Sequence, residues 1–140
     1  MDKNIKNPDL NLNKLWGENL QGQQERTHYN DVNPIIRKYL QTNMCRGTLL
    51  DLGCGYGQMS NIFNKIGFSV TAIDGDYKRI VEAKLKYSNI DFKCHKIEST
   101  LPFEDNSFDV LFSRSVFQYI EHESILKECK RVLKKDGSII

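Results

Sequence analysis

The sequence of 140 residues predicts an α/β fold, in which helices cover both faces of a doubly wound, mostly parallel β-sheet. Two observations predict it. Short apolar segments, suited to strands that are buried on both faces, alternate along the chain with segments of helical periodicity. The order strand, helix, strand is typical of parallel sheets, because two parallel strands need a crossover connection between them.

The composition is typical of a globular domain, with 39% hydrophobic and 27% charged residues. No apolar run approaches the roughly 20 residues that cross a bilayer, and the polar amino terminus lacks a signal-peptide core. We therefore expect a cytoplasmic protein without a membrane partner. A net charge of +2, with both signs mixed along the chain, does not favour a nucleic-acid partner. The cysteines lie far apart without a Cys-x-x-Cys pair, which predicts free, mostly buried thiols at Cys45, Cys54, Cys94 and Cys129.

The polar residues 1–32 are expected to form a lid or a flexible segment, and residues 33–140 the folded domain. Asn33 followed by Pro34 is typical of a helix start, and this first helix should end before Gly47. A buried strand over 48–52 is expected next.

The elements after this strand follow from periodicity, turn residues and helix caps. They are a helix around 59–66 that Gly67 closes, a strand over 68–73, a helix capped by Asp76 that carries Ile80, Val81, Ala83 and Leu85, strands over 90–94 and 108–112, a helix from about 121 to 134, a turn at Asp136 and Gly137, and the start of a fifth strand at 138–140.

Three glycines, Gly53, Gly55 and Gly57, fall where the first strand turns into the next helix, so a ligand can approach the backbone there. Their spacing differs from the Gly-x-Gly-x-x-Gly of dinucleotide sites, because position 58 is Gln. Asp51 precedes the loop, where a carboxylate can accept hydrogen bonds from a positively charged amino group. S-adenosylmethionine carries such a group. Asp74 follows about 20 residues later, the distance at which an acid typically binds ribose hydroxyls.

Four segments together resemble the class I S-adenosylmethionine-dependent methyltransferases, particularly the small-molecule group that includes ubiquinone and menaquinone biosynthesis methyltransferases. They are Leu-Asp-Leu-Gly-Cys-Gly-Tyr-Gly at 50–57, Val-Thr-Ala-Ile-Asp at 70–74, Leu-Pro-Phe-Glu-Asp-Asn-Ser-Phe-Asp-Val at 101–110, and Arg-Val-Leu-Lys-Lys-Asp-Gly at 131–137. The resemblance covers residues 49–140 and implies a Rossmann-like sheet of seven strands. Since this chain stops in the fifth, we expect a fragment or a shortened product whose open sheet edge pairs in a homodimer or with another chain.

The resemblance also implies the cofactor contacts. It assigns Asp51 and the three loop glycines to the methionine part of S-adenosylmethionine, Asp74 to the ribose, and Ile97 to the adenine. Lys96 stands where relatives carry an acid that contacts the adenine amino group, and Glu98 is the expected substitute. Cys54, Gly75 and Ser113 complete the candidate cofactor-binding set, although Cys54 also fits a small buried filler.

The expected activity is methyl transfer to a small-molecule acceptor by in-line displacement, for which no metal is needed and no catalytic residue is assigned. His28, His95 and His122 lack metal-ligand spacing. The basic residues Lys130, Arg131, Lys134 and Lys135 are interpreted as a solvated helix end rather than an RNA-binding patch. Two alternatives stay open: a cofactor-binding but catalytically inactive interaction module, and an NAD-dependent dehydrogenase, which the glycine spacing disfavours.

Overall fold

The computed structural model describes residues 47–114, 116–119 and 122–140. The segment 1–32 and the helix expected to begin at Asn33 therefore lie outside the described residues. In the part of the chain that is described, no helix is long and apolar enough to span a bilayer.

Five parallel strands form one sheet in the order β3-β2-β1-β4-β5, which confirms the predicted doubly wound α/β fold. The strands are β1 (Gly47–Leu52), β2 (Phe68–Asp74), β3 (Asp91–Cys94), β4 (Phe108–Ser113) and β5 (Leu133–Ile139). The chain moves outward from β1 to β3 and then returns to the other side of β1. This reversal, between β1 and β4, is where sheets of this kind open a crevice for ligands at the carboxyl ends of the strands.

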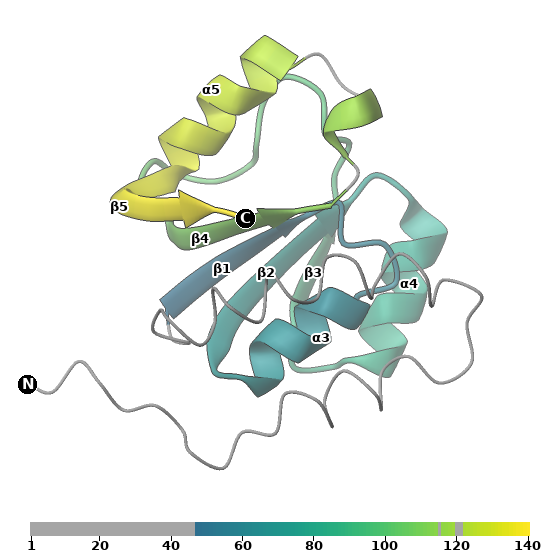
Figure 1. Ribbon diagram of the computed structural model, residues 1–140. Helices are drawn as coiled ribbons and strands as arrows, with labels where there is room; N and C mark the ends of the chain where they lie inside the picture. Colours follow the sequence, from purple (N-terminus) through teal and green to yellow (C-terminus); the bar gives the residue numbers. More distant parts are fainter. Residues whose placement is uncertain (1–46, 115, 120–121) are drawn as a thin grey trace, which may run out of the picture. The chain divides into compact units, whose positions relative to one another are not determined.

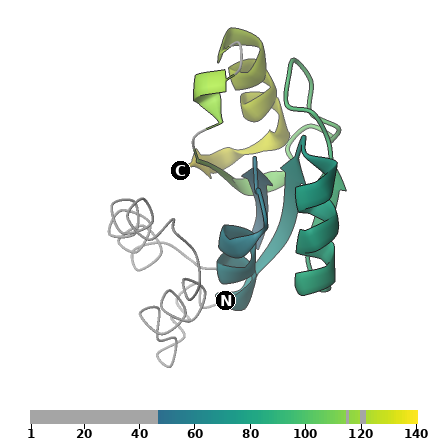
Figure 2. The same cartoon turned by 90° about the vertical axis from the view of Figure 1, so that its right-hand side faces the viewer.

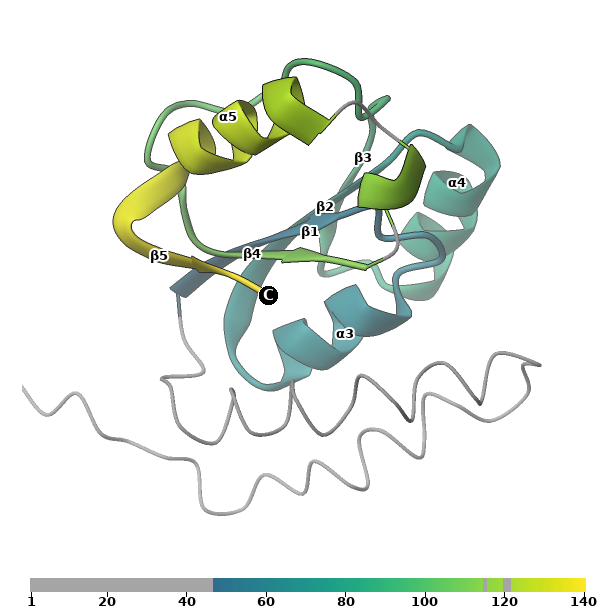
Figure 3. The same cartoon turned by 45° about the horizontal axis from the view of Figure 1, so that its top comes forward.

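Helices cover both faces of the sheet: α3 and α4 lie on one face and α5 on the other (Figures 1 and 3). A view turned by 90° shows the strong twist between β1 and the edge strand β5 (Figure 2). The helices are α3 (Gln58–Lys65), α4 (Tyr77–Lys86), the short 3₁₀ helix η1 (Phe117–Tyr119) and α5 (His122–Val132).

The central strand β1 contributes side chains to both layers of the core, because successive side chains in a strand point to opposite faces. Leu50 and Leu52 are fully buried in a cluster with Ile125 and Val132 of α5. Asp51, one residue out of phase with them, faces α3 instead, where it bonds to Ser60. A carboxylate is thus placed in the layer that α3 covers.

The helix α4 begins as predicted, with Asp76 accepting the N–H groups of Lys78 and Arg79. The buried face of α4 is narrower than the sequence predicts. Ile80 and Ala83 are buried, whereas the side chains of Val81 and Leu85 are 37% and 82% exposed. The helix therefore contacts the sheet through one narrow stripe, and Val81 and Leu85 point to other sides of it.

The expected boundary between the last helix and the last strand is wrong. The helix α5 ends at Val132 and not near 134. The backbone N–H of Ser107 donates to the Val132 carbonyl (2.8 Å), and Leu133 already pairs with Phe108 as part of a strand. The expected turn at Asp136 and Gly137 lies inside β5, at a register shift where β5 advances by more residues than β4.

We expect Asp76→Ala to lower the free energy of unfolding by about 1 kcal/mol, the usual cost of losing an N-cap. The side chain serves two amides of α4, at 2.9 and 3.3 Å, so their loss frays the first turn. Urea unfolding followed by circular dichroism measures this change. Equal stability of wild type and variant would show that the cap contributes nothing.

Candidate functional site

The carboxyl ends of β1, β2 and β4 meet at one edge of the sheet and are joined there by hydrogen bonds. The N–H groups of Gly53 and Cys54 both donate to the Ile73 carbonyl, at 2.8 and 3.0 Å. From the other side, the Ser113 hydroxyl donates to the Leu52 carbonyl (3.1 Å). The first turn of the glycine loop is therefore fixed against both neighbouring strands.

The Asp74 carboxylate holds the next part of the loop. One oxygen accepts the Gly55 N–H (2.9 Å) and the other accepts the Asp76 N–H (2.9 Å). A carboxylate has about four acceptor positions, so two further donors can still bind. The side chain is also partly open to solvent. Asp74 thus combines a structural role with free capacity to accept two hydroxyl groups.

The three loop glycines have backbone conformations that favour glycine, with φ of +82°, +54° and +81° at Gly53, Gly55 and Gly57. At Gly57 a Cβ atom would lie 2.6 Å from the ring of Phe92, so glycine is needed for α3 to begin there. At Gly55, apart from its own chain neighbours, no atom of the described residues lies within 4 Å of the position that a Cβ would take. Gly55 therefore leaves open space beside Asp74.

Asp51 is only 1% exposed and accepts a hydrogen bond from the Ser60 hydroxyl (2.5 Å). The pKa of Asp51 is raised to about 7, mainly by burial. The Ser60 hydrogen bond acts against this rise, and the negative charge of Asp74 adds to it. Burial, with the charges of Asp51 and Asp74, also raises the pKa of the Cys54 thiol. Cys54 therefore stays protonated at neutral pH, and such a thiol is a poor nucleophile.

The candidate residues of the adenine side lie on the connection between β3 and β4. Ile97 is buried (9% exposed) against the core cluster, and Lys96 contacts Glu98 in an exposed ion pair. The connection runs beside the loop region, since His95 donates to the Asp74 carbonyl (3.0 Å) and Lys96 Cα lies 3.6 Å from the Cβ position of Gly75. The loop glycines, Cys54, Asp74, Gly75 and Ser113 thus lie at the carboxyl edge, Asp51 is buried beneath it, and Ile97 and Glu98 lie on the connection that runs beside it. Glu98 is engaged by Lys96.

Two contacts of this region were not predicted from the sequence. Ser60 sits at the start of α3 within its buried face, and a hydroxyl among Met59, Ile62 and Phe63 was the available signal for a polar partner of Asp51. The interpretation of the basic cluster as a solvated helix end is wrong at Arg131, which is partly buried. Arg131 bonds to Glu128, Asp105 and two backbone carbonyls, and Lys134 pairs with Asp109. Only tertiary contacts, absent from the sequence pattern, distinguish Arg131 from the exposed Lys130, Lys134 and Lys135.

Within the described residues, no group of three or more His, Cys, Asp or Glu side chains is arranged to hold a metal ion. Of the thiols described, Cys54 and Cys129 are buried and Cys94 is exposed, and none forms a disulfide.

Comparison with known proteins identifies the family to which this fold and site correspond. A family model described as "Methyltransferase domain" matches residues 50–140. The chain is 34% identical over 95 residues to the uncharacterized methyltransferase YodH of Bacillus subtilis, covering 66% of this chain and 41% of YodH. It is 27% identical over 128 residues to a ubiquinone biosynthesis O-methyltransferase of Bradyrhizobium, covering 78% of this chain and 50% of that protein. The chain therefore spans about half the length, or less, of these relatives.

Among solved structures, the PH0226 protein of Pyrococcus horikoshii is similar, with a TM-score of 0.74 and 28% identity. The similarity covers 85% of this chain and 57% of that one. The described sheet and its crossover helices are thus found in a protein longer than this chain.

We expect the stability of the protein to fall as the pH rises through 7, relative to Asp51→Asn. A carboxyl group whose folded pKa of about 7 exceeds its unfolded value stabilises the fold fully below the unfolded value and loses that contribution as it ionises. Between pH 4 and pH 8 the difference should amount to on the order of 3–4 kcal/mol. Urea unfolding of both proteins across this range measures it. A stability difference that is independent of pH would contradict the raised pKa.

Proposed function

The chain belongs to the methyltransferase domain family, and on that premise we propose that it binds S-adenosylmethionine at the carboxyl edge of its sheet and transfers the methyl group to a small-molecule acceptor. The observation that carries this proposal is the arrangement of Asp74 beside Gly55. Asp74 is a partly exposed carboxylate with free acceptor positions, and Gly55 has open space where another residue would place its side chain.

The chemistry of the site residues fits the proposed cofactor in three places. The remaining acceptor positions of Asp74 match the two hydroxyls of a ribose. The negative charge that Asp51 carries once ionised suits the ammonium group of the amino-acid part. Ile97, buried beside the start of the β3–β4 connection, offers an apolar surface for a flat base. We assign the remaining candidates, Gly53, Cys54, Gly57, Gly75, Glu98 and Ser113, to the walls of the same site.

When bound, S-adenosylmethionine supplies a methyl group that its sulfonium already activates. The task left to the protein is to bind the cofactor rigidly, to align an acceptor in line with the methyl group, and to exclude water. The fixed loop and the buried Asp51 serve the first requirement. Methylation of a neutral hydroxyl acceptor releases its proton, which a base or water must take up, and we assign this role to none of the described residues.

The acceptor class is proposed from similarity. One relative is named for O-methylation in ubiquinone biosynthesis, so phenolic or quinol-like compounds are the acceptors to test first. Because this chain spans half of that relative, residues outside the chain can contribute to acceptor binding in a longer protein.

We expect Asp74→Ala to weaken binding of S-adenosylhomocysteine by about 1–3 kcal/mol, because two hydroxyl donors lose their acceptor. Isothermal titration calorimetry of the purified chain measures this. Asp76→Ala is the matched control, since it removes a neighbouring carboxylate that caps α4 and lies outside the proposed contacts. The control should bind like the wild type. Equal affinity of Asp74→Ala and the wild type for S-adenosylhomocysteine would refute the assignment. Tight binding of NAD, without binding of S-adenosylmethionine or S-adenosylhomocysteine, would refute it as well.

We further expect the purified chain, incubated with S-adenosylmethionine and a set of phenolic and quinol acceptors, to release S-adenosylhomocysteine only when a suitable acceptor is present. Coupled detection of that product measures turnover. Binding of the cofactor without turnover on any acceptor would instead support the alternative of an inactive interaction module.

A further inference from the structure

The connection between β3 and β4, residues 95–107, forms the adenine side of the proposed site although it contains no helix or strand. It nevertheless buries two side chains, Ile97 (9% exposed) and Leu101 (4% exposed), in the core cluster. A segment without regular structure keeps such a conformation only when other groups satisfy its backbone. The partners of this backbone therefore determine where Ile97 lies.

At its start the connection is held by β2 and by itself. His95 donates its N–H to the Asp74 carbonyl (3.0 Å), and His95 Nε2 lies 3.1 Å from the Thr100 carbonyl oxygen. The ring thus closes the short turn that contains Ile97. This end of the connection is fixed to the residue proposed to bind the ribose.

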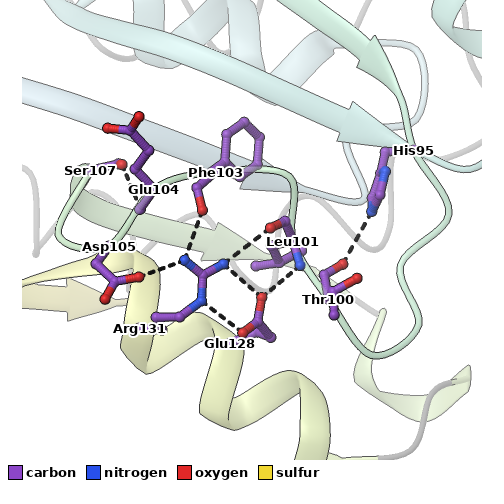
Figure 4. Close-up of polar contacts among 9 residues, drawn as sticks. All are labelled: His95, Thr100, Leu101, Phe103, Glu104, Asp105, Ser107, Glu128 and Arg131. Atoms are coloured by element: carbon purple, nitrogen blue, oxygen red, sulfur yellow. Dashed lines mark hydrogen bonds and ion pairs between the residues drawn. The ribbon is translucent and has the colours of Figure 1, made fainter.

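At its other end the connection is held by two side chains of α5 (Figure 4). Glu128 accepts the Leu101 N–H at 2.7 Å. Arg131 donates to the carbonyls of Leu101 (3.1 Å) and Phe103 (2.8 Å), and to the Asp105 carboxylate (2.8 Å). These bonds satisfy backbone groups that no strand or helix serves.

Glu128 and Arg131 also fix each other. Arg131 Nε and Nη2 donate to the two oxygens of Glu128, both at 2.7 Å, in the parallel arrangement that a guanidinium makes with a carboxylate. The two side chains are 17% and 31% exposed. The hydrogen bonds from Arg131, followed by that from Leu101, lower the pKa of Glu128 to about 2, so the pair stays charged over the physiological range.

We propose that Glu128 and Arg131 are positioning residues for the base of the bound nucleoside: they fix Leu101 and Phe103, and through the short segment back to His95 they hold Ile97 against the site. The inference rests on the proposed function, because it assumes that the segment 97–101 borders a nucleoside. It adds that residues of α5, which do not line the site, set the affinity for its ligand.

Arginine is required in this arrangement, because one planar group must reach two carbonyls and two carboxylates at once. The ammonium of lysine carries the same charge but lacks the rigid fork of donors. Arg131→Lys therefore separates the effect of geometry from the effect of charge. Lys134→Met is the matched control, because the ion pair of Lys134 with Asp109 (3.0 Å) also joins this end of the chain to β4 but does not touch the connection.

Two ligands test the inference by calorimetry: S-adenosylhomocysteine, and 5′-methylthioadenosine, which carries the same adenosine without the amino acid. We expect Arg131→Lys and Arg131→Met to weaken both ligands by a similar factor, about tenfold, since a less ordered loop must be fixed on binding. Asp51→Asn should weaken S-adenosylhomocysteine alone. Lys134→Met should leave both affinities unchanged. Hydrogen exchange of residues 97–105 should be faster in the two Arg131 variants.

If the wild type binds both ligands and the Arg131 variants bind them with the same affinities, the inference is overturned and the proposed function remains intact. An equal loss in Lys134→Met would also overturn it, because the effect would then be one of general stability. If Arg131→Met fails to fold, Glu128→Gln, which keeps an acceptor for the Leu101 N–H, provides the same comparison. A wild type that binds neither nucleoside would refute the proposed function itself.

Discussion

The hydrogen bonds of the Asp74 carboxylate are the interaction on which the proposed site depends. Its two oxygens hold the Gly55 and Asp76 amides, each at 2.9 Å, and so join the glycine loop after β1 to the start of α4. The backbone of the preceding residue, Ile73, binds the first two amides of the same loop. The end of β2 thereby determines the shape of a loop that follows a different strand. A site built in this way is largely formed before any ligand arrives.

The same edge of the sheet is built from two kinds of contact with different chemistry. The Asp74 side relies on short-range bonds between neighbouring strands, whereas the adenine side relies on the Glu128–Arg131 pair, which lies 27 to 30 positions away along the chain from the Leu101 backbone groups that it binds. Strand pairing cannot supply partners for an irregular connection, so long charged side chains take that role. The segments 101–110 and 131–137, which are separate motifs in the sequence, are thus parts of one hydrogen-bonded unit.

Local patterns in the sequence predicted most of the fold, because β1, β2 and β4 are rich in apolar residues and Asp76 caps a helix in its own neighbourhood. They failed where a tertiary contact decided the outcome. Pairing of Leu133 with Phe108 ended α5 early, and Arg131 bonded to other parts of the chain although the preceding Lys130 is exposed. The loop glycines and Asp74 were proposed as site residues from their spacing, and the structure brings Gly55 and Asp74 into contact. Ser60 was missed, since a hydroxyl inside an apolar helix face identifies no partner until the opposite strand is known.

The position of β1 at the centre of the sheet has a consequence for the order in which the protein can fold. Its partner β2 follows closely in the chain, but its other partner β4 arrives much later, and contacts such as that between Thr48 and Asp109 span 61 positions. Closing such a long loop costs chain entropy before the contact is gained. During synthesis on the ribosome, the edge of β1 that pairs with β4 therefore stays unpaired until β4 emerges. A nascent chain of this kind exposes an unpaired strand edge for that interval, and such edges are where incompletely folded chains associate with one another.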